Sequence, residues 1–385
     1  MSIVMTGATA TLVEEAVALR RRLHHRPELS GEEHETTAIV RRRLQDLGLI
    51  EIDCPTPTGA VAILDTGRPG RRVMLRADID AVPVTENSGL SFSSEMPGRM
   101  HGCGHDGHTA MLLAAAEHLT RMDKLTGSFV FCFQPAEETL SGARAMVDGG
   151  LMDAVRPDRV IGLHLSSLLP SGVAHVRAGI QLAWAAGFRI TVRGTGGHNA
   201  TGGNSVNRRL GELCLRTPDI AQGLTAEGAL AVASIGNVTT DGAWNTAPTH
   251  AFLGGTHRAF SAEHHVTLNK RLHRLVDEIG GELEITATAP AVVNDTATVT
   301  ALESVCSALG VPLQHLEKPL VFADDVAEFL SRAGGCYFML GARPPDLEVG
   351  APHHAPAFRI YEAAFGTGIA LLSNLAARLA ATADA

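Results

Sequence analysis

The run SFVFCFQPAEE, residues 128–138, decides which kind of fold this chain can form. Its first six residues are mostly aromatic or β-branched and carry no charge, which is typical of a strand buried on both faces. Gln134 and Pro135 end the strand, and Glu137 and Glu138 follow at once. Open α/β sheets bind ligands beyond the carboxyl ends of their strands, so we expect these carboxylates at the edge of such a sheet.

Helices and strands alternate on both sides of this run over roughly the first 180 residues. Apolar spacing predicts helices over 11–23, 32–47, 109–119 and 143–148. Apolar and β-branched runs predict strands over 60–64, 73–75 and 160–165. The expected fold class is therefore α/β, a layered domain around a central mixed sheet.

The pattern changes between 185 and 293. Strands are expected over 188–192, 229–238, 250–253 and 283–288, with helices over 205–215 and 262–279. The α/β pattern resumes with a helix over 300–309, a strand over 336–340 and a helix from 361. Because 385 residues exceed the length at which single cores tend to split, we predict a discontinuous domain, 1–184 and 294–385, with an α+β insert, 185–293.

Composition excludes several functions. The net charge is −9 and no long basic run is present, so we expect no nucleic-acid surface. The N-terminus lacks the basic and apolar regions of a signal peptide, and no stretch reaches the roughly 18 apolar residues of a membrane span. The six cysteines are scattered, which favours reduced thiols and a cytoplasmic protein that does not contact a membrane.

The densest cluster of reactive side chains is MHGCGHDGH, residues 100–108. Its glycines allow close approach of side chains, and Cys103 and His105, two apart on an extended turn, can face one ion. A thiolate and an imidazole suit Zn²⁺ or another first-row metal. A glycine-rich loop with surface histidines is the alternative explanation of this segment alone.

Three further groups fall at strand ends or turns: Glu137–Glu138, then His164 after Gly162-Leu163, then His353-His354 before Pro356. Neighbours in an extended segment point to opposite sides, so one glutamate could bind metal while the other addresses a water. Each group alone is more often a solvated pair or a hydrogen-bonded histidine. Four such groups in one α/β chain indicate a metal site.

These motifs occur in an order that resembles the aminoacylase/hippurate hydrolase branch of the M20 metallopeptidases. The matching stretches span nearly the whole chain: LHHRPELS (23–30), LRADIDAVP (75–83), MHGCGHDGH (100–108), QPAEE (134–138), GGH (196–198), WNTAP (244–248), GTHR (255–258) and HAP (354–356). The resemblance implies a catalytic domain with a dinuclear metal site and a smaller inserted domain that acts as a lid and in dimerisation.

The resemblance implies a ligand set of Cys103, His105, Glu138, His164 and His354. These would hold two divalent ions per subunit, Zn²⁺ or Mn²⁺, with Co²⁺ or Ni²⁺ also able to serve. Cys103 would bridge the ions, one of them with Glu138 and His354, the other with His105 and His164. Glu137 would be the general base. The aspartates expected to orient ligands are Asp78, Asp80 and Asp106.

The insert would supply the remaining groups. The resemblance implies a homodimer or higher homo-oligomer in which His198 reaches the partner's active site and stabilises the oxyanion. Asn245 and Arg258 would hold the carboxylate of the substrate. The chain departs from the family pattern at 199–204, 245–249 and 322–326. We expect these segments near the substrate, so they bear on specificity and not on hydrolysis.

The expected function is metal-dependent hydrolysis of the amide bond of N-acyl or N-aroyl amino acids, a small-molecule substrate class. A dipeptidase, a carboxypeptidase or a hydrolase of another small amide is the alternative on the same fold. A metal-binding protein without catalysis is the third reading. Glu137 speaks against it, because a protein that only binds ligands has no need of a base beside its ligand set.

Overall fold

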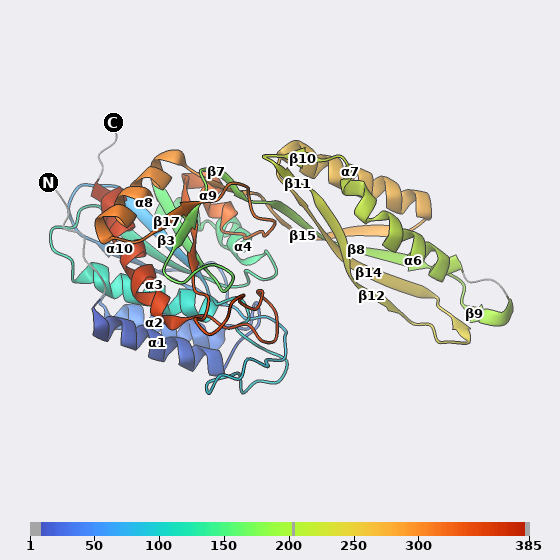
Figure 1. The fold of residues 1–385 in the computed structure, drawn as a ribbon, viewed down its shortest axis with the longest axis horizontal. Coiled ribbons are helices and arrows are strands. Elements are labelled where there is room, and N and C mark those ends of the chain that lie inside the picture. The colour runs from blue at the N-terminus through green and yellow to red at the C-terminus, as the bar shows by residue number, and fades with distance from the viewer. Residues whose placement is uncertain (1–8, 202–204, 382–385) are drawn as a thin grey trace. The chain divides into compact units, whose positions relative to one another are not determined.

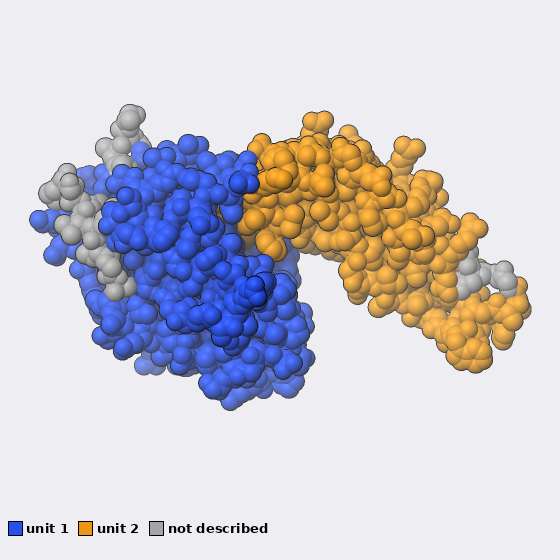
Figure 2. All heavy atoms as spheres, in the orientation of Figure 1, with its two compact units in different colours: residues 1–179, 293–317, 325–385 blue, residues 180–292, 318–324 orange. Residues whose placement is uncertain are grey.

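The computed structural model describes residues 9–201 and 205–381. They divide into two compact units (Figure 2), unit 1 with Met1–Gly179, Val293–Glu317 and Asp325–Ala385, and unit 2 with Ile180–Val292 and Lys318–Asp324. The predicted insert, 185–293, lacks the last of these segments. Leu320 N–H donates to Gln181 O at 2.8 Å. This pairing joins 318–324 to unit 2 across a long sequence separation, which a local pattern cannot reveal.

Unit 1 is built on an eight-stranded sheet (Figure 1) in the order β1-β2-β4-β3-β5-β18-β6-β17. The strands are β1 (Ile50–Ile52), β2 (Ala60–Asp65), β3 (Arg72–Asp78), β4 (Ser128–Gln134), β5 (Arg159–Ser166), β6 (Ala174–Val176), β17 (Leu313–His315) and β18 (Gly335–Gly341). Strands β4, β3, β5 and β18 run parallel, while β1-β2-β4 and β18-β6 pair antiparallel. The predicted mixed sheet is confirmed.

Helices bury the parallel strands, and every residue of β4 and β18 is buried. The helices of unit 1 are α1 (Ala10–His25), α2 (His34–Asp46), α3 (His105–Thr120), α4 (Gly142–Asp148), α5 (Leu151–Val155), α8 (Thr296–Leu309), α9 (Ala327–Ala333) and α10 (Phe365–Ala381). Helix α3 packs on β3 and contacts α1, α2 and α10. It is buried almost all round, which its small residues and absence of a polar stripe permit.

The segment Glu362–Ala381 comprises a short 3₁₀ turn, Glu362–Ala364, and helix α10. By length and composition this segment could cross a membrane, contrary to the reading of the sequence that no stretch is apolar enough. Within the protein 78% of its most apolar window is buried. Helix α10 contacts α3, α8 and β3, so its apolar composition is explained by its place in the core.

Unit 2 is an α+β unit with a four-stranded antiparallel sheet in the order β12-β14-β8-β15. Its main elements are β8 (Trp184–Arg193), α6 (Ser205–Arg216), β12 (Val232–Thr240), β14 (His250–Ala259), α7 (Ala262–Ile279) and β15 (Glu282–Ala289). Shorter elements are β9 (Gly197–His198), 3₁₀ turns Asn199–Thr201 and Pro218–Ala221, β10 (Thr225–Ala226), β11 (Ala229–Leu230) and β13 (Thr246–Ala247). Two further strands, β7 (Gly179–Leu182) and β16 (Val292–Asn294), fall where the chain passes from one unit to the other. Helices α6 and α7 contact β14 and β8.

A histidine lies in the core of unit 2 where a sheet residue is usually apolar. His257 on β14 is fully buried, and its Nε2–H donates to Asn269 Oδ1 at 2.9 Å. Its other ring nitrogen, Nδ1, is buried without a hydrogen-bond partner. Burial lowers the pKa of His257 to about 4; Asn269 opposes this shift, and His265 and Arg258 add to it. The folded unit therefore resists protonation of His257.

We expect His257 to make unit 2 sensitive to acid. Between pH 6.5 and about 4 the unfolded chain binds a proton at this residue and the folded chain does not. Stability is therefore retained above pH 6.5 and falls as the pH drops, by about 3 kcal/mol in all. Urea unfolding at pH 7 and pH 4.5 should show a smaller acid loss in His257→Val than in the wild type. The exposed His273→Ala is the matched control, and equal losses in all three proteins would contradict the assignment.

Candidate metal centre and active site

The predicted ligands of unit 1 gather beyond the carboxyl ends of the parallel strands. Strand β3 ends at Asp78, and β5 carries His164 near its end. Glu137 and Glu138 follow β4, and His353 and His354 lie in the segment after β18. Because parallel strands end at one edge of the sheet, side chains up to 250 residues apart in sequence meet there.

The glycine-rich segment is shorter than the sequence suggested. Gly104 has a left-handed backbone, φ 92°, and His105 is already the first residue of α3. The prediction of an extended turn through 108 was wrong, while an ion shared by Cys103 and His105 stays a prediction. A left-handed residue redirects the chain, so Cys103 and His105 belong to different groups of ligand atoms.

Four groups of side chains in unit 1 have ligand atoms within 4.8 Å of one another: Cys103/Glu138/His354, Cys103/His164/His353, His105/Glu137/Glu138 and His105/His108/His164. The first is one of the two predicted ligand sets. The second predicted set, Cys103 with His105 and His164, does not occur as a group among the described residues. Cys103 belongs to two of the groups, as a bridging thiolate would require.

Hydrogen bonds fix which ring nitrogen each histidine presents. His105 Nδ1 lies 3.0 Å from Asp80 O and 3.2 Å from Asp80 Oδ1, and donates to Asp80. His164 Nδ1–H donates to Leu165 O at 2.7 Å. In both histidines Nε2 is left facing the site, and His164 Nε2 is 3.5 Å from Cys103 Sγ.

His108 is a different case, because both its ring nitrogens are occupied. Nδ1–H donates to Asp78 Oδ1 at 2.6 Å, and Nε2 accepts from Leu165 N–H at 2.9 Å. It thus holds the end of β3 to the end of β5 and offers no lone pair to an ion. Sequence reasoning quoted this histidine in the motif but gave it no role.

Charges set the protonation of the metal-free site. Burial, and then the carboxylates of Glu138 and Glu137, raise the pKa of the Cys103 thiol well above its usual value. Burial alone would lower the pKa of His105, but Asp78, Asp80 and Glu138 outweigh it and raise the pKa to about 10. Without metal, therefore, Cys103 and His105 both carry protons at neutral pH.

A buried chain of ion pairs lies behind the centre. Arg76 Nη1 donates to Asp78 Oδ2 at 2.8 Å, and Nη2 donates to Asp325 Oδ1 at 3.2 Å. Gln134 Nε2 donates to the same Asp325 oxygen at 2.6 Å. Asp325 falls in a segment, 322–326, that we expected near the substrate. Its buried carboxylate binds Arg76, which holds Asp78, and one of its oxygens lies within 4.8 Å of an oxygen of Glu137. No local pattern predicts this pairing, since Arg76 and Asp325 are 249 residues apart in the chain.

Two of the predicted orienting aspartates contact the ligands or their neighbours directly. Asp80 accepts from His105 and also, through Oδ2, from Glu138 N–H at 3.0 Å and Ser30 O–H at 2.7 Å. Asp78 holds His108 and lies 3.7 Å from His105 Nε2. Asp80 thereby positions an imidazole from α3 and a carboxylate from the turn after β4.

Asp106 contacts no ligand atom within the described ranges, contrary to its predicted role. Its carboxylate binds Arg20 Nε at 2.8 Å and His24 Nδ1 at 2.7 Å, and accepts from Gly107 N–H at 2.9 Å. Residue 106 is the second of α3, so its side chain leaves the helix on a different side from His105. Asp106 therefore anchors the start of α3 to α1.

The glutamate pair lies in a turn and not in the extended segment that we predicted. Ala136 has φ 53°, and its N–H donates to Glu33 Oε1 at 2.8 Å. Glu137 Oε2 and Glu138 Oε1 are consequently both close to His105 Nε2, at 3.9 Å and 3.8 Å. His354 Nε2 lies 3.1 Å from the other oxygen of Glu138. Glu138 thus faces two histidines, while Glu137 stands beside it.

Unit 2 brings together two of its three predicted residues. His198 pairs with Thr246 between β9 and β13, and Asn199 N–H donates to Asn245 O at 3.0 Å. His198 and Asn245 therefore share the turn beyond the end of β14 at which His250 lies. Arg258 lies near the opposite end, about 26 Å further along a strand that rises roughly 3.3 Å per residue. One chain cannot aim all three side chains at one substrate.

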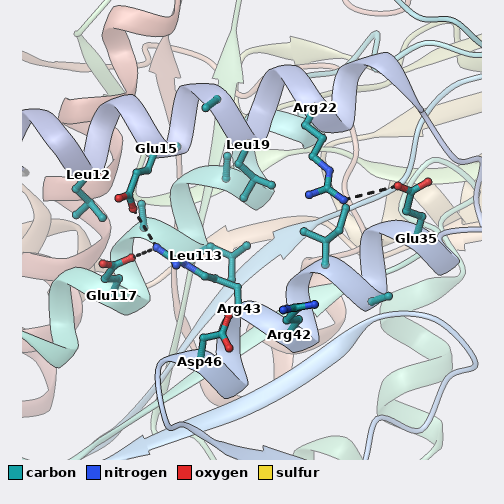
Figure 3. A pocket seen from close by; sticks show the side chains of 16 residues that line it. Leu12, Glu15, Leu19, Arg22, Glu35, Arg42, Arg43, Asp46, Leu113 and Glu117 are labelled. Atoms are coloured by element: carbon teal, nitrogen blue, oxygen red, sulfur yellow. Dashed lines mark hydrogen bonds and ion pairs between the residues drawn. The ribbon is translucent and has the colours of Figure 1, made fainter.

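A groove of about 600 Å³ between α1 and α2, with α3 below (Figure 3), contains none of the predicted site residues. Apolar residues such as Leu12, Leu19 and Leu113 line it. Its charged residues pair between helices; Arg43 binds Glu15 at 3.0 Å as well as Glu117. We regard this groove as a feature of helix packing.

The side chains at the strand ends fit divalent cations. His105 Nε2 and Glu138 Oε1 are buried, face the site and have no hydrogen-bond partner. Leaving such atoms unsatisfied costs about 1–3 kcal/mol each, and a cation would satisfy both. Thiolate, imidazole and carboxylate donors suit first-row divalent metals. Fold and site together define a class: an α/β protein with a dinuclear metal centre at the strand ends.

Comparisons with known proteins give the family. The sequence model of the peptidase family M20/M25/M40 matches residues 74–378, and the chain belongs to this family. The aminoacylase/hippurate hydrolase-like branch fits, and the protein is a hydrolase that acts on amide bonds.

Relatives are similar over nearly their whole length. The thermostable carboxypeptidase 1 of Saccharolobus solfataricus is 33% identical over 364 residues, covering 90% of each chain. The N-acetylcysteine deacetylase of Bacillus subtilis is 31% identical over 370 residues, covering 94% of this chain and 95% of the relative. The crystal structure of the Bacillus subtilis YXEP protein, described as a dinuclear metal binding peptidase of the M20 family, has a TM-score of 0.78, 28% identity and coverage of 97% and 99%.

Metal binding should release protons from the site. Ligands must be deprotonated to bind, and raised pKa values leave Cys103 and His105 protonated near pH 7. We expect about two protons per pair of ions at pH 7, so affinity rises with pH. Calorimetry of Zn²⁺ binding in buffers of different ionisation enthalpy measures the release. Cys103→Ser should reduce it by about one proton, and Cys214→Ser should leave it unchanged. A release that does not depend on Cys103 would contradict a thiolate ligand.

Proposed function

We propose that this protein hydrolyses the amide bond of N-acyl or N-aroyl amino acids, giving a carboxylate and a free amino acid. Two relatives support the substrate class, since a deacetylase of N-acetylcysteine and a carboxypeptidase each cut an amide whose nitrogen belongs to an amino acid. We further propose Zn²⁺ or Mn²⁺ as the ions, and a cytoplasmic location in keeping with six free cysteines.

The observation that carries the proposal is the position of Glu137. Its carboxylate lies 3.9 Å from His105 Nε2, beside Glu138. Glu137 belongs to a group of possible ligands with His105 and Glu138, while the two groups that contain Cys103 form without it. A carboxylate beside the ions that Cys103 would bind is placed to accept a proton from a water there.

Two bound ions would lower the pKa of a water between them towards 7 and polarise the amide carbonyl. The residues of the chain supply the proton transfer. A water oxygen adds to the carbonyl carbon while a Glu137 carboxylate oxygen takes its proton. The same oxygen returns the proton to the leaving nitrogen as the C–N bond breaks. Asp80 keeps Glu138 and His105 in place during both steps through its hydrogen bonds.

The alternative substrate is a peptide, cut by a dipeptidase or carboxypeptidase activity on the same centre. The name of the carboxypeptidase relative favours it. Both substrate types present a free carboxylate on the leaving amino acid, for which a guanidinium such as Arg258 is the suited partner. The substrates of the two activities therefore differ in the acyl group and have the leaving amino acid in common.

We propose that the chain acts as a homodimer formed through unit 2. Strand β12 is an edge of the unit 2 sheet, and its sequence VASIGNVTT has no charged residue and no proline. The other edge, β15, carries Glu282 and Glu284. Long uncharged edges invite pairing with another chain. The exposed Trp244, at 91%, lies in the same turn as Asn245 beyond the end of β12.

A dimer would also explain why the candidate substrate-binding residues of unit 2 lie far apart. His198 and Asn245 lie at one end of β14 and Arg258 near the other. A site that uses all three would therefore take Arg258 from one chain and His198 with Asn245 from its partner. In that arrangement His198 would stabilise the oxyanion that develops on the carbonyl oxygen.

Substitutions of the two adjacent glutamates should have different effects on activity and on metal content. Glu137→Gln should retain two ions and lose activity by at least about 10²–10⁴-fold, while Glu138→Gln should lose or loosen an ion. We would load metal-free protein with Zn²⁺, Mn²⁺, Co²⁺ or Ni²⁺, measure metal content, and assay a panel of N-acyl amino acids, dipeptides and simple amides without a carboxylate. High activity of Glu137→Gln would remove it as the base. Turnover confined to the simple amides would overturn the substrate class.

Subunit mixing tests the role of His198. Glu137→Gln and His198→Ala should each be inactive, but a mixed dimer would hold one site with an intact Glu137 and a partner's intact His198. Activity should return to a fraction of wild type after the subunits exchange. A mixture of Glu137→Gln with Cys103→Ser, two changes of the same unit, should stay inactive as the control. If exchange is demonstrated by differently tagged chains and no activity returns, His198 does not act across a dimer.

A further inference from the structure

The segment after β18 carries two adjacent histidines, and only His354 was expected to bind metal. His353 Nδ1 lies 3.4 Å from Cys103 Sγ. The ring centroids of His353 and His164 are 5.0 Å apart. These three side chains place their ligand atoms within 4.8 Å of one another. An imidazole beyond the five expected ligands thus contacts the thiol that both ions would share.

The backbone explains how neighbouring histidines reach different sides. His354 has a left-handed backbone, φ 64°, which is uncommon for a residue other than glycine. Its N–H donates to Gly102 O at 2.9 Å, so the turn is fixed to the segment that carries Cys103. His354 Nε2 then meets Glu138 Oε2 at 3.1 Å, while His353 faces Cys103 and His164.

We propose that His353 is a metal ligand, and that the two histidines serve different ions. His353 would bind the ion on the side of His164, and His354 the ion on the side of Glu138, with Cys103 common to both. The two groups Cys103/His164/His353 and Cys103/Glu138/His354 share the thiol and no other residue. This is the geometry in which one thiolate links two ions.

The donor types make the two positions chemically different. Cys103, His164 and His353 offer one sulfur and two nitrogens, a set that suits Zn²⁺ or Co²⁺. The other group replaces one imidazole with the Glu138 carboxylate, a harder ligand that Mn²⁺ also accepts. The binding position on the His353 side should therefore prefer Zn²⁺ and Co²⁺ over Mn²⁺ more strongly than the other position does.

A simpler role for His353 is packing. Its ring centroid lies 5.1 Å from that of Phe358, and the contact with Cys103 could be a thiol–imidazole hydrogen bond. His353→Phe distinguishes the two roles, because phenylalanine fills the space but has no lone pair. If packing were the whole role, His353→Phe would bind metal as the wild type does.

The test is a titration of the full-length, metal-free protein with Co²⁺. Calorimetry measures the affinity of each binding step, and the absorption of the Co²⁺–thiolate chromophore reports the ligands. His353→Ala and His353→Phe should each weaken one of the two binding steps by at least about 10–100-fold, the loss seen even when a ligand's hydrogen-bond partner is removed. The Co²⁺ spectrum of that step should change. His354→Ala should weaken the other step, and the exposed His315→Ala should weaken neither.

Two results would overturn the proposal. One is wild-type affinity and an unchanged spectrum in His353→Phe, and the other is loss of the same step in His353→Ala and His354→Ala. Thermal unfolding of the metal-free variants checks that each chain folds. The inference rests on the paired metal site and not on the substrate, so failure of every N-acyl amino acid in an activity panel would leave this binding test intact.

Discussion

Several buried carboxylates lie close together in this structure, and their negative charge must be compensated. Asp78, Asp80, Glu137 and Glu138 lie around one imidazole, that of His105. A buried charge without a partner costs several kcal/mol. Arg76 compensates part of this charge, because its guanidinium pairs with both Asp78 and Asp325. On the front side His105 Nε2 and Glu138 Oε1 remain without partners, and cations are what this side of the site requires.

The parallel strands at the centre of the sheet bring these charged side chains together at one edge. Strands β4, β3, β5 and β18 end at one edge. Asp78 and His164 lie at or near the ends of β3 and β5, the two glutamates follow β4, and the two histidines lie in the longer segment after β18. Hydrogen bonds then align the contributions, since His108 links Asp78 to Leu165 and Asp80 links His105 to the turn of Glu138. The burial of α3 allows its first residue to reach the same edge. The site therefore combines side chains of strands and of α3 with side chains of turns, and hydrogen bonds hold the turns in place.

Unit 2 differs from unit 1 in that its candidate residues do not lie together in one site. His198 and Asn245 meet in one turn, while Arg258 lies near the other end of β14. The uncharged edge β12 and the charged edge β15 give the sheet one side suited to a second chain. If the proposed dimer forms, each chain would complete the site of the other, and assembly would be a condition of catalysis.

Local periodicity and short motifs were enough to predict the α/β class, the α+β character of the insert, the order of the elements and the family. Residues 128–138 alone predicted a buried strand followed by two carboxylates, and β4 and its turn have this form. Tertiary structure decided what local pattern cannot encode. It added 318–324 to unit 2 and joined Asp325 to Arg76, pairings between residues far apart in the chain. It also ended the turn at Gly104, turned the chain at Ala136 and directed His353 to Cys103, since single left-handed residues and long-range contacts, not periodicity, set where those side chains point.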